Sequence, residues 1–175
     1  LPILFISHEH SDHIAGLQQL LKRFDIPVYT KQGTWREIQD KLIVPKNQLI
    51  ELTKGSLTLG NLIVEPFAVS HDAADPIGIN VFAGKDKATV VTDTGVISDS
   101  ILRRMDDTTL LVLEANYDPH MLRFGPYQPF LKQRVASDEG HLSNEMAAQA
   151  LLMMNRPDFM QVILAHRSEN NNNAV

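Results

Sequence analysis

The stretch Ser7-His8-Glu9-His10-Ser11-Asp12-His13 directly follows an apolar run over residues 1–6. The run shows no alternation of polar and apolar residues, so we predict a strand that is covered on both faces. Beyond the stretch, apolar side chains recur at helical spacing, at Ile14, Leu17, Leu20, Leu21 and Phe24. The sequence therefore predicts a strand, a polar loop and an amphipathic helix in that order.

The polar loop has the residue types and the spacing of a metal site. Residues two apart in an extended segment point the same way, so His8 and His10 can place two imidazoles on one metal. Asp12 and His13 lie where the loop turns into the helix, and they can serve a second metal. Imidazole and carboxylate groups together suit zinc, manganese or iron. The alternative, a surface loop that happens to be rich in histidine, does not account for this spacing.

Polar residues that could complete such a site each follow an apolar run. They are His71, Asp93, Glu114 and His166. Strands fix positions while the loops after them stay open, so a ligand just past a buried strand is a common way to build a site. Taken alone, each residue has a plain structural explanation, such as a hydrogen-bonded histidine or a turn-forming aspartate. The repetition of the pattern favours the metal site.

The composition is that of an ordinary folded domain. Of the 175 residues, 43% are hydrophobic and 21% are charged, and there is no cysteine. The lack of cysteine excludes disulfides and cysteine-based zinc sites and fits a reducing cytoplasm. No apolar run reaches the length of a membrane-spanning helix, so we expect no membrane partner. The net charge of −5 argues against an extended nonspecific nucleic-acid surface but leaves room for a local basic patch.

The rest of the chain reads as mixed α and β structure. Two hairpins are predicted, with turns at Gly60-Asn61 and at residues 84–87, and later strands at residues 110–113 and 162–165. Thr34, Ser98 and Ser143 are placed to cap helices. The asparagine run at residues 170–173 predicts a loop or a disordered tail.

The pattern His8-x-His10-x-Asp12-His13, followed by His71, Asp93 and His166, resembles the metallo-β-lactamase superfamily over nearly the whole chain. The resemblance implies an α/β (α+β) fold, a four-layer αββα sandwich with a dinuclear site at one edge of its two sheets. The implied ligands are His8, His10 and His71 for the first metal, Asp12, His13 and His166 for the second, and Asp93 as a bridge. We expect residues 1–175 to be a single metallo-hydrolase domain and a fragment, lacking the family's N-terminal strands and the C-terminal end.

Four further segments resemble the YycJ/WalJ subgroup, which is bacterial, cytoplasmic and associated with DNA exonuclease activity. They are residues 69–76, 92–95, 140–145 and 165–168. In the similar tRNase Z and phosphodiesterase branch, a Glu after a strand pairs with a His before a helix, and Glu114 and His141 occupy these places. The chain departs from the subgroup, which would have His near Tyr117 and Leu at Arg167, so substrate contacts can differ.

The resemblance implies hydrolysis of a phosphodiester, with DNA as the expected substrate. A hydroxide held between the two metals would attack phosphorus, because coordination lowers the pKa of bound water. Asp12 would orient this nucleophile, and His141, held by Glu114, would protonate the departing oxygen. Basic residues that could contact phosphates are Arg103, Arg104, Arg123, Lys132, Arg134 and Arg167. His120 belongs to no motif and is interpreted as an ordinary surface histidine.

Two other functions remain as alternatives. One is a small-molecule hydrolase, such as a lactonase, a thioesterase or a cyclic phosphodiesterase. The other is a metal-stabilised binding protein without catalysis, against which the ligand set with His141 and Glu114 argues. The redox di-iron branch usually has Glu where His10 stands, so oxygen reduction is not expected. The histidine-rich set favours two zinc ions, and manganese or iron also suits it. The oligomeric state is not predicted.

Overall fold

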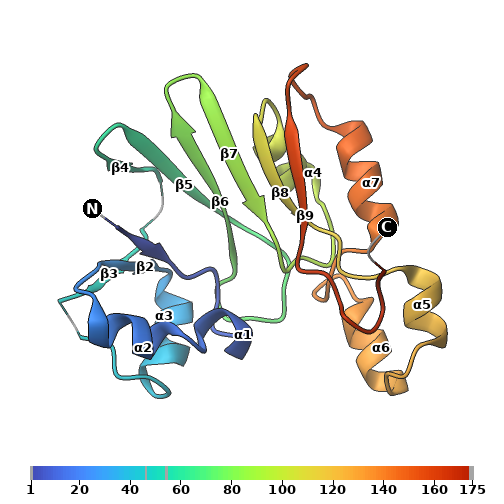
Figure 1. The fold of residues 1–175 in the computed structure, drawn as a ribbon, viewed down its shortest axis with the longest axis horizontal. Coiled ribbons are helices and arrows are strands. Elements are labelled where there is room, and N and C mark those ends of the chain that lie inside the picture. The colour runs from blue at the N-terminus through green and yellow to red at the C-terminus, as the bar shows by residue number, and fades with distance from the viewer. Residues whose placement is uncertain (1, 46, 54, 174–175) are drawn as a thin grey trace. The chain divides into compact units, whose positions relative to one another are not determined.

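The computed structural model describes residues 2–45, 47–53 and 55–173, and its chain divides into two compact units (Figure 1). Unit 1 comprises Leu1–Gly55 and Ala73–Ile77, and unit 2 comprises Ser56–Asp72 and Gly78–Val175. Leu1, the first residue of the first predicted strand, lies outside the described residues. No helix among the described residues is long and apolar enough to cross a membrane.

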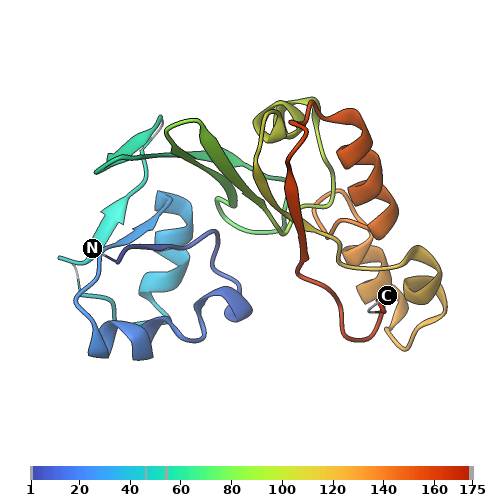
Figure 2. The ribbon, with the colours of Figure 1, turned by 45° about the horizontal axis from the view of Figure 1, so that its top comes forward.

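Unit 1 is built on a small parallel sheet with the order β1-β2-β3 (Figure 2). Its strands are β1 (Leu4–Phe5), β2 (Val28–Thr30) and β3 (Leu49–Glu51), and its helices are α1 (Ser11–Ile14), α2 (Leu17–Arg23) and α3 (Gln32–Gln39). Apolar side chains from these elements form one core. Its buried members are Ile6, Ile14, Leu17, Leu21, Ile26, Val28, Ile38 and Val44.

Two predictions for unit 1 were wrong in detail. The helix expected to run from Ile14 to Phe24 is interrupted between α1 and α2, and Phe24 is 54% exposed because the backbone there is already extended. Thr34 does not cap α3, since the helix begins at Gln32 after the N-cap residue Lys31. The buried Thr34 hydroxyl donates instead to the carbonyl oxygen of Asp75 at 3.3 Å.

Unit 2 contains a six-stranded sheet with the order β4-β5-β6-β7-β8-β9. The strands are β4 (Leu57–Leu59), β5 (Leu62–Ala68), β6 (Ile77–Ala83, whose first residue belongs to unit 1), β7 (Asp86–Val91), β8 (Leu110–Glu114) and β9 (Gln161–Ala165). Both predicted hairpins are confirmed as antiparallel pairs, β4 with β5 and β6 with β7. The second turn is shorter than predicted, because Asp86 and Lys87 already pair with β6. β7, β8 and β9 are parallel neighbours.

Helices α4 (Asp99–Met105) and α7 (Asn144–Met153) pack on one face of this sheet. Their N-caps were predicted correctly: Ser98 Oγ accepts from the Ile101 N–H at 3.3 Å, and Ser143 Oγ accepts from the Met146 N–H at 3.1 Å. Alternate residues of the strands complete the core, among them Val91, Leu111 and Leu113. This packing fixes the ends of the strands, where the polar candidates lie.

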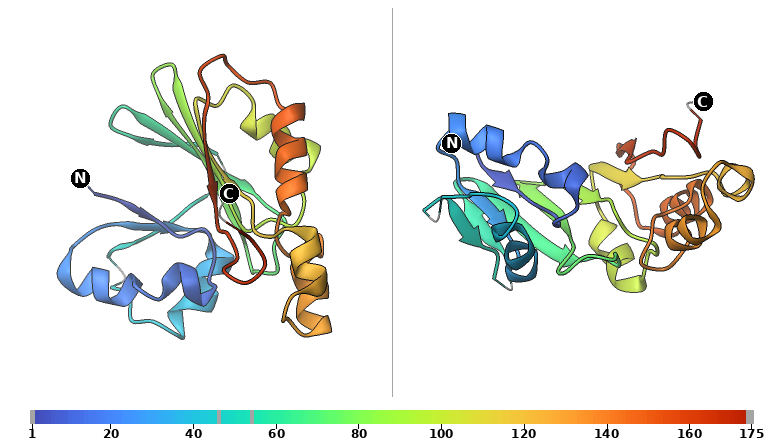
Figure 3. Two further views of the ribbon diagram at one scale, coloured as in Figure 1. Left: turned by 45° about the vertical axis from the view of Figure 1, so that its right-hand side comes forward. Right: turned by 90° about the horizontal axis from the view of Figure 1, so that it is seen from below.

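Two short helices beyond the end of β8 were not predicted. They are α5 (Pro119–Phe124) and α6 (Pro129–Val135), which lie side by side in Figures 1 and 3. Each has proline in its first turn, a position where the missing N–H costs nothing. Their buried residues, Leu122 and Val135, pack with Tyr117.

The asparagine run forms an ordered loop, so the prediction of a loop holds and the alternative of a disordered tail does not. Asn171 is buried, and its carbonyl oxygen accepts from the Asp118 N–H at 2.8 Å. The Asn172 amide donates to the carbonyl oxygens of Ala115 and Asn116 at 2.8 and 3.0 Å. The loop thereby ties the segment after β9 to the segment after β8.

Candidate metal centre

The histidines of the opening loop gather within unit 1. The His8 ring centroid lies 4.6 Å from that of His10 and 4.1 Å from that of His13. His8 is buried, whereas the Asp12 side chain is 61% exposed. Ser7 Oγ lies 3.1 Å from His8 Nδ1 and 3.3 Å from His13 Nδ1. The serine hydroxyl thus orients two of the three imidazoles, a role that the spacing of the motif did not indicate.

The candidates of unit 2 come together through the topology of its sheet. Asp93 follows β7, Glu114 ends β8, and His166 follows β9. Because these strands are parallel neighbours, their carboxyl ends lie at the same edge of the sheet. Asp93, Glu114, His141 and His166 each offer a possible ligand atom, and these atoms lie within 4.8 Å of one another.

Glu114 is the hydrogen-bonding hub of this group, and it is fully buried. Its Oε1 lies 2.9 Å from Nδ1 of His141 and 2.8 Å from Nδ1 of His166. Its Oε2 accepts from the backbone N–H groups of Thr94 and Leu142 at 3.0 and 3.1 Å. One carboxylate therefore holds the segments after β7, before α7 and after β9.

The ionisation state of Glu114 decides which ring nitrogen of each histidine donates a hydrogen bond to it. Burial alone would raise the pKa of Glu114, but the hydrogen bonds from His141 and His166 outweigh burial, and the net shift is downward. An ionised carboxylate only accepts hydrogen bonds, so both Nδ1 atoms donate to Glu114 and each Nε2 remains available for another contact. His166 Nε2 lies 3.3 Å from Asp93 Oδ1.

His71 is held in the corresponding way by backbone groups. Its Nδ1 donates to the carbonyl oxygens of Gly140 at 3.0 Å and Glu139 at 3.1 Å. Its Nε2 lies 3.8 Å from Asp93 Oδ1. Burial lowers the pKa of His71 despite the opposing effect of the Asp93 carboxylate, so the neutral imidazole is favoured. A neutral imidazole with Nδ1 donating presents Nε2 as a ligand atom.

Of the three non-glycine residues with a positive φ in the described part of the chain, two are predicted ligands and the third is Asp107. Asp93 and His166 have φ angles of 56° and 52°, in the left-handed region that non-glycine residues seldom adopt. Such a conformation costs on the order of 1–3 kcal/mol and is found preferentially at functional sites. Gly140, which precedes His141, allows a close approach, since a Cβ there would lie 2.2 Å from the carbonyl oxygen of Arg134.

Two positioning residues of unit 2 were missed by sequence reasoning. Thr94 donates its backbone N–H to Glu114, and its Oγ1 accepts from the Ser70 N–H at 3.2 Å. Asn116 Nδ2 donates to the carbonyl oxygen of His166 at 2.7 Å. Each contact joins residues far apart in the chain, so no local pattern could have indicated it.

The donor sets of both units fit divalent metal ions. They consist of imidazoles and carboxylates, and in unit 2 the His71 and His166 Nε2 atoms face a carboxylate. Carboxylates and carbonyl oxygens that accept from the far ring nitrogen of a ligating histidine are the usual support for such a site. The groups are thus able to bind divalent metal ions, and this arrangement does not determine which metal binds.

The domain family described as "Beta-lactamase superfamily domain" matches residues 1–166. The chain belongs to this superfamily.

Two relatives in the beta-lactamase superfamily resemble the chain along most of its length. It is 37% identical to the exodeoxyribonuclease YycJ of Bacillus anthracis over 171 residues, covering 97% of this chain and 65% of that protein. It is 34% identical to the exodeoxyribonuclease WalJ of Streptococcus pneumoniae serotype 2 over 177 residues, covering 98% of this chain and 65% of that protein. The chain thus spans slightly less than two thirds of each relative. The predicted likeness to the YycJ/WalJ subgroup is confirmed.

Solved structures of the superfamily share the fold at lower identity. The metallo-β-lactamase fold protein YhfI of Bacillus subtilis has a TM-score of 0.74 and 19% identity, covering 97% of this chain and 66% of that chain. The short form of human tRNase Z has a TM-score of 0.64 and 20% identity, covering 94% of this chain and 71% of that chain. These likenesses confirm the predicted fold class, the metallo-β-lactamase fold of mixed α and β structure.

Proposed function

We propose that this chain carries the catalytic centre of a dinuclear-metal-dependent phosphodiesterase that removes nucleotides from DNA ends. Two superfamily relatives at 34% and 37% identity are named exodeoxyribonucleases. The observation that carries the proposal is the buried Glu114 carboxylate, which orients His141 and His166 at once. One of these histidines would serve the metals and the other the reaction.

The ligand assignment follows the superfamily resemblance. His8, His10 and His71 would hold one ion, Asp12, His13 and His166 would hold the other, and Asp93 would bridge them. Zinc is favoured by the number of imidazoles, and manganese or iron also suits the set. The unit 2 members of this set support the assignment, because His71 and His166 both present Nε2 near Asp93.

When bound, the two ions would supply a nucleophile at neutral pH and offset the negative charge that builds on the phosphoryl oxygens. The protein's own residues would orient the attacking group and donate a proton. Asp12 would orient the attacking group, and Asp93 would be a ligand of both ions. His141 would give a proton to the departing oxygen, and the Glu114 carboxylate stabilises the imidazolium that donates it.

The test combines metal analysis with digestion of end-labelled DNA. We expect about two equivalents of a divalent metal per purified chain, stepwise shortening of the DNA from one end, and turnover of bis-p-nitrophenyl phosphate. Digestion with zinc, manganese and iron in turn would identify the active metal. One metal equivalent or fewer at saturation, or saturation with metal and no turnover of either phosphodiester, would overturn the proposal.

A further inference from the structure

Residues 119–135, which include α5 and α6, differ in composition from the rest of this acidic chain. They contain no aspartate or glutamate, and their charged residues are Arg123, Lys132 and Arg134. The same stretch carries three aromatic residues, Phe124, Tyr127 and Phe130. Basic and aromatic residues are therefore interleaved over two short helices in a chain whose net charge is −5.

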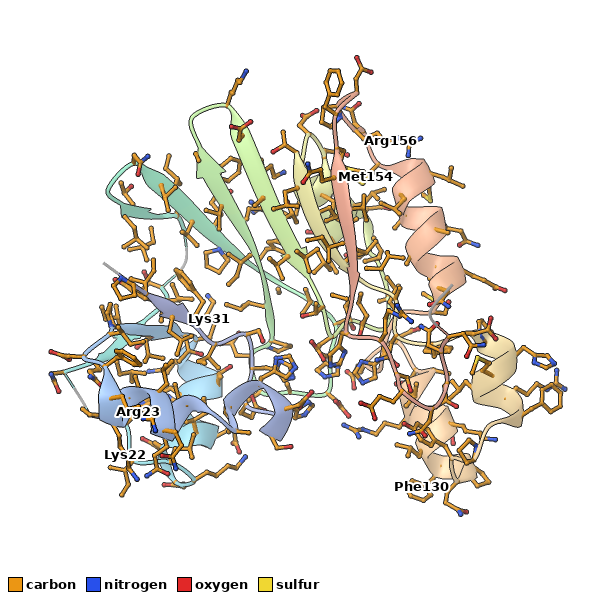
Figure 4. All side chains as sticks on the ribbon, in the orientation of Figure 1. Lys22, Arg23, Lys31, Phe130, Met154 and Arg156 are labelled. Carbon is orange, nitrogen blue, oxygen red and sulfur yellow. The ribbon has the colours of Figure 1, made fainter. Side chains whose placement is uncertain are left out.

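Two of these three rings are exposed, whereas the half-buried Tyr127 packs against the core of α5 and α6. Phe124 is 67% exposed and Phe130 is 74% exposed. Phe130 points outward from α6 in Figure 4. The Arg123 guanidinium lies 5.4 Å from the centre of the Phe124 ring, and the His120 ring centroid lies 4.6 Å from it. An exposed ring beside a cation is a platform on which a base can stack.

The two helices contact each other. Lys132 Nζ of α6 donates to the carbonyl oxygen of Arg123 at the end of α5, at 2.8 Å. We define the α5–α6 surface as Arg123, Phe124, Phe130, Lys132 and Arg134. Two acidic side chains next to this surface already have partners: Asp72 forms an ion pair with Arg134, and Asp118 caps α5. Asp138 and Glu139 follow α6 in the chain.

This surface adjoins an open pocket that reaches two of the proposed site residues. The pocket holds about 390 Å³, and His141 and His166 line it together with Tyr127, Arg134 and Arg167. Asn116 and Glu169 also contribute to its wall. Arg134 belongs both to the α5–α6 surface and to the pocket, so the two are continuous.

We infer that the α5–α6 surface binds single-stranded DNA and leads its end into this pocket. The inference rests on the proposed function and specifies the form of its substrate. Bases would stack on Phe124 and Phe130, while Arg123, Lys132 and Arg134 would contact phosphates. Stacking selects unpaired bases, because the faces of bases within a duplex are already covered by their neighbours. Charge complementarity favours a polyanion over a second copy of this acidic chain.

The first test removes the rings. We would measure binding of a fluorescent phosphorothioate oligothymidine, which resists cleavage, to the metal-loaded chain by anisotropy. The double variant F124A/F130A should bind at least about tenfold more weakly, because each stacked base contributes roughly fivefold to a hundredfold. The matched control is F24A/F159A, which removes two rings that are 54% and 92% exposed elsewhere. Equal affinities of these two double variants would overturn the inference.

The second test removes charge. The variant R123Q/K132Q should reduce the slope of log affinity against log salt by about 1.4, since each lost phosphate contact on a single strand accounts for about 0.7. The control K22Q/R23Q alters two exposed basic residues of α2 and should leave the slope unchanged. An equal change in both variants would show that only net charge matters, against a defined surface.

Strandedness and oligomeric state complete the design. The chain should bind the single strand at least about tenfold more tightly than a duplex of the same length, and F124A/F130A should narrow this difference. The inference would be overturned if F124A/F130A lost as much affinity for the duplex as for the single strand. It would also be overturned if this variant changed from dimer to monomer while its affinity for DNA stayed the same. Turnover of bis-p-nitrophenyl phosphate should be the same in both ring variants and in the unaltered chain. Its absence from all three would count against the proposed function instead.

Discussion

The two units hold their polar candidates in contrasting ways. In unit 1, His8, His10, Asp12 and His13 come from one short loop, and a serine from that same loop contacts two of the histidines. In unit 2, the candidates come from the ends of different strands and are joined by one buried carboxylate, Glu114. The first group is local in sequence, and the second exists only once the sheet has formed.

This difference shows how each of the two groups of candidates is held in position. A loop beside a short parallel sheet can bring imidazoles together by spacing alone. The unit 2 group depends on strand register, on a left-handed backbone at Asp93 and His166, and on four hydrogen bonds to Glu114. Changes in unit 2 should therefore have wider effects than changes in unit 1.

The largest effect is expected for Asp93→Ala. If the unit 2 group binds metal through this carboxylate, the variant should lose metal and phosphodiester turnover together, with turnover falling more than about 1000-fold. Metal content by mass spectrometry and turnover of bis-p-nitrophenyl phosphate check this. Asp86→Ala, an exposed change at the start of β7, the strand that precedes Asp93, should alter neither metal content nor turnover. Retention of both properties in Asp93→Ala would rule out its bridging role.

The next effect is expected for His141→Ala. Loss of a proton donor should slow turnover by about 100- to 10,000-fold while metal content stays near two ions. The exposed His120 provides the control, because His120→Ala removes an imidazole that no motif uses. Loss of metal from His141→Ala would reassign this residue as a ligand, and the unit 2 group would then hold more metal ligands than proposed.

Glu114→Gln tests the hub itself. The amide nitrogen cannot accept the hydrogen bonds that the carboxylate now takes, so buried donors would lose partners at a cost of about 2–4 kcal/mol in the free energy of unfolding. Metal affinity should fall about tenfold to a hundredfold, because His166 loses its support. Urea unfolding and metal titration measure the two effects. The control in unit 1 is Glu9→Gln, which keeps the oxygen that accepts from the Ala74 N–H. It should change the free energy of unfolding and the metal affinity far less than Glu114→Gln does.

Sequence reasoning recovered the parts of the molecule that are local. The opening loop, the two hairpins and the caps Ser98 and Ser143 follow from short patterns. It missed α5 and α6, which bury few residues and so show little periodicity, and it wrongly included Phe24 in the apolar face of a helix. It paired Glu114 with His141 by resemblance but could not show that the same oxygen also contacts His166. That contact depends on the register between β8 and β9.

The smallest effect is expected for Thr34→Val in unit 1. The buried hydroxyl donates to Asp75, so its loss should cost about 1 kcal/mol in the free energy of unfolding. Metal content and turnover should not change. Thermal unfolding measures this, with Thr58→Val on an exposed position of β4 as the control. A loss of metal from Thr34→Val would contradict the view that the unit 1 loop is held by local contacts.

The central place of Glu114 also sets an order of assembly. When β8 has just been synthesised, both histidines that contact its carboxylate are still to come, because His141 and His166 follow it in the chain. An ionised carboxylate is costly to bury without partners, so this edge of the sheet cannot close until β9 has paired with β8. The loop of unit 1 does not depend on β8 or β9, because its candidate ligands lie close together in the sequence. A nascent chain would therefore have the candidate ligands of unit 1 early, whereas the group around Glu114 would be complete only after the last described strand had paired.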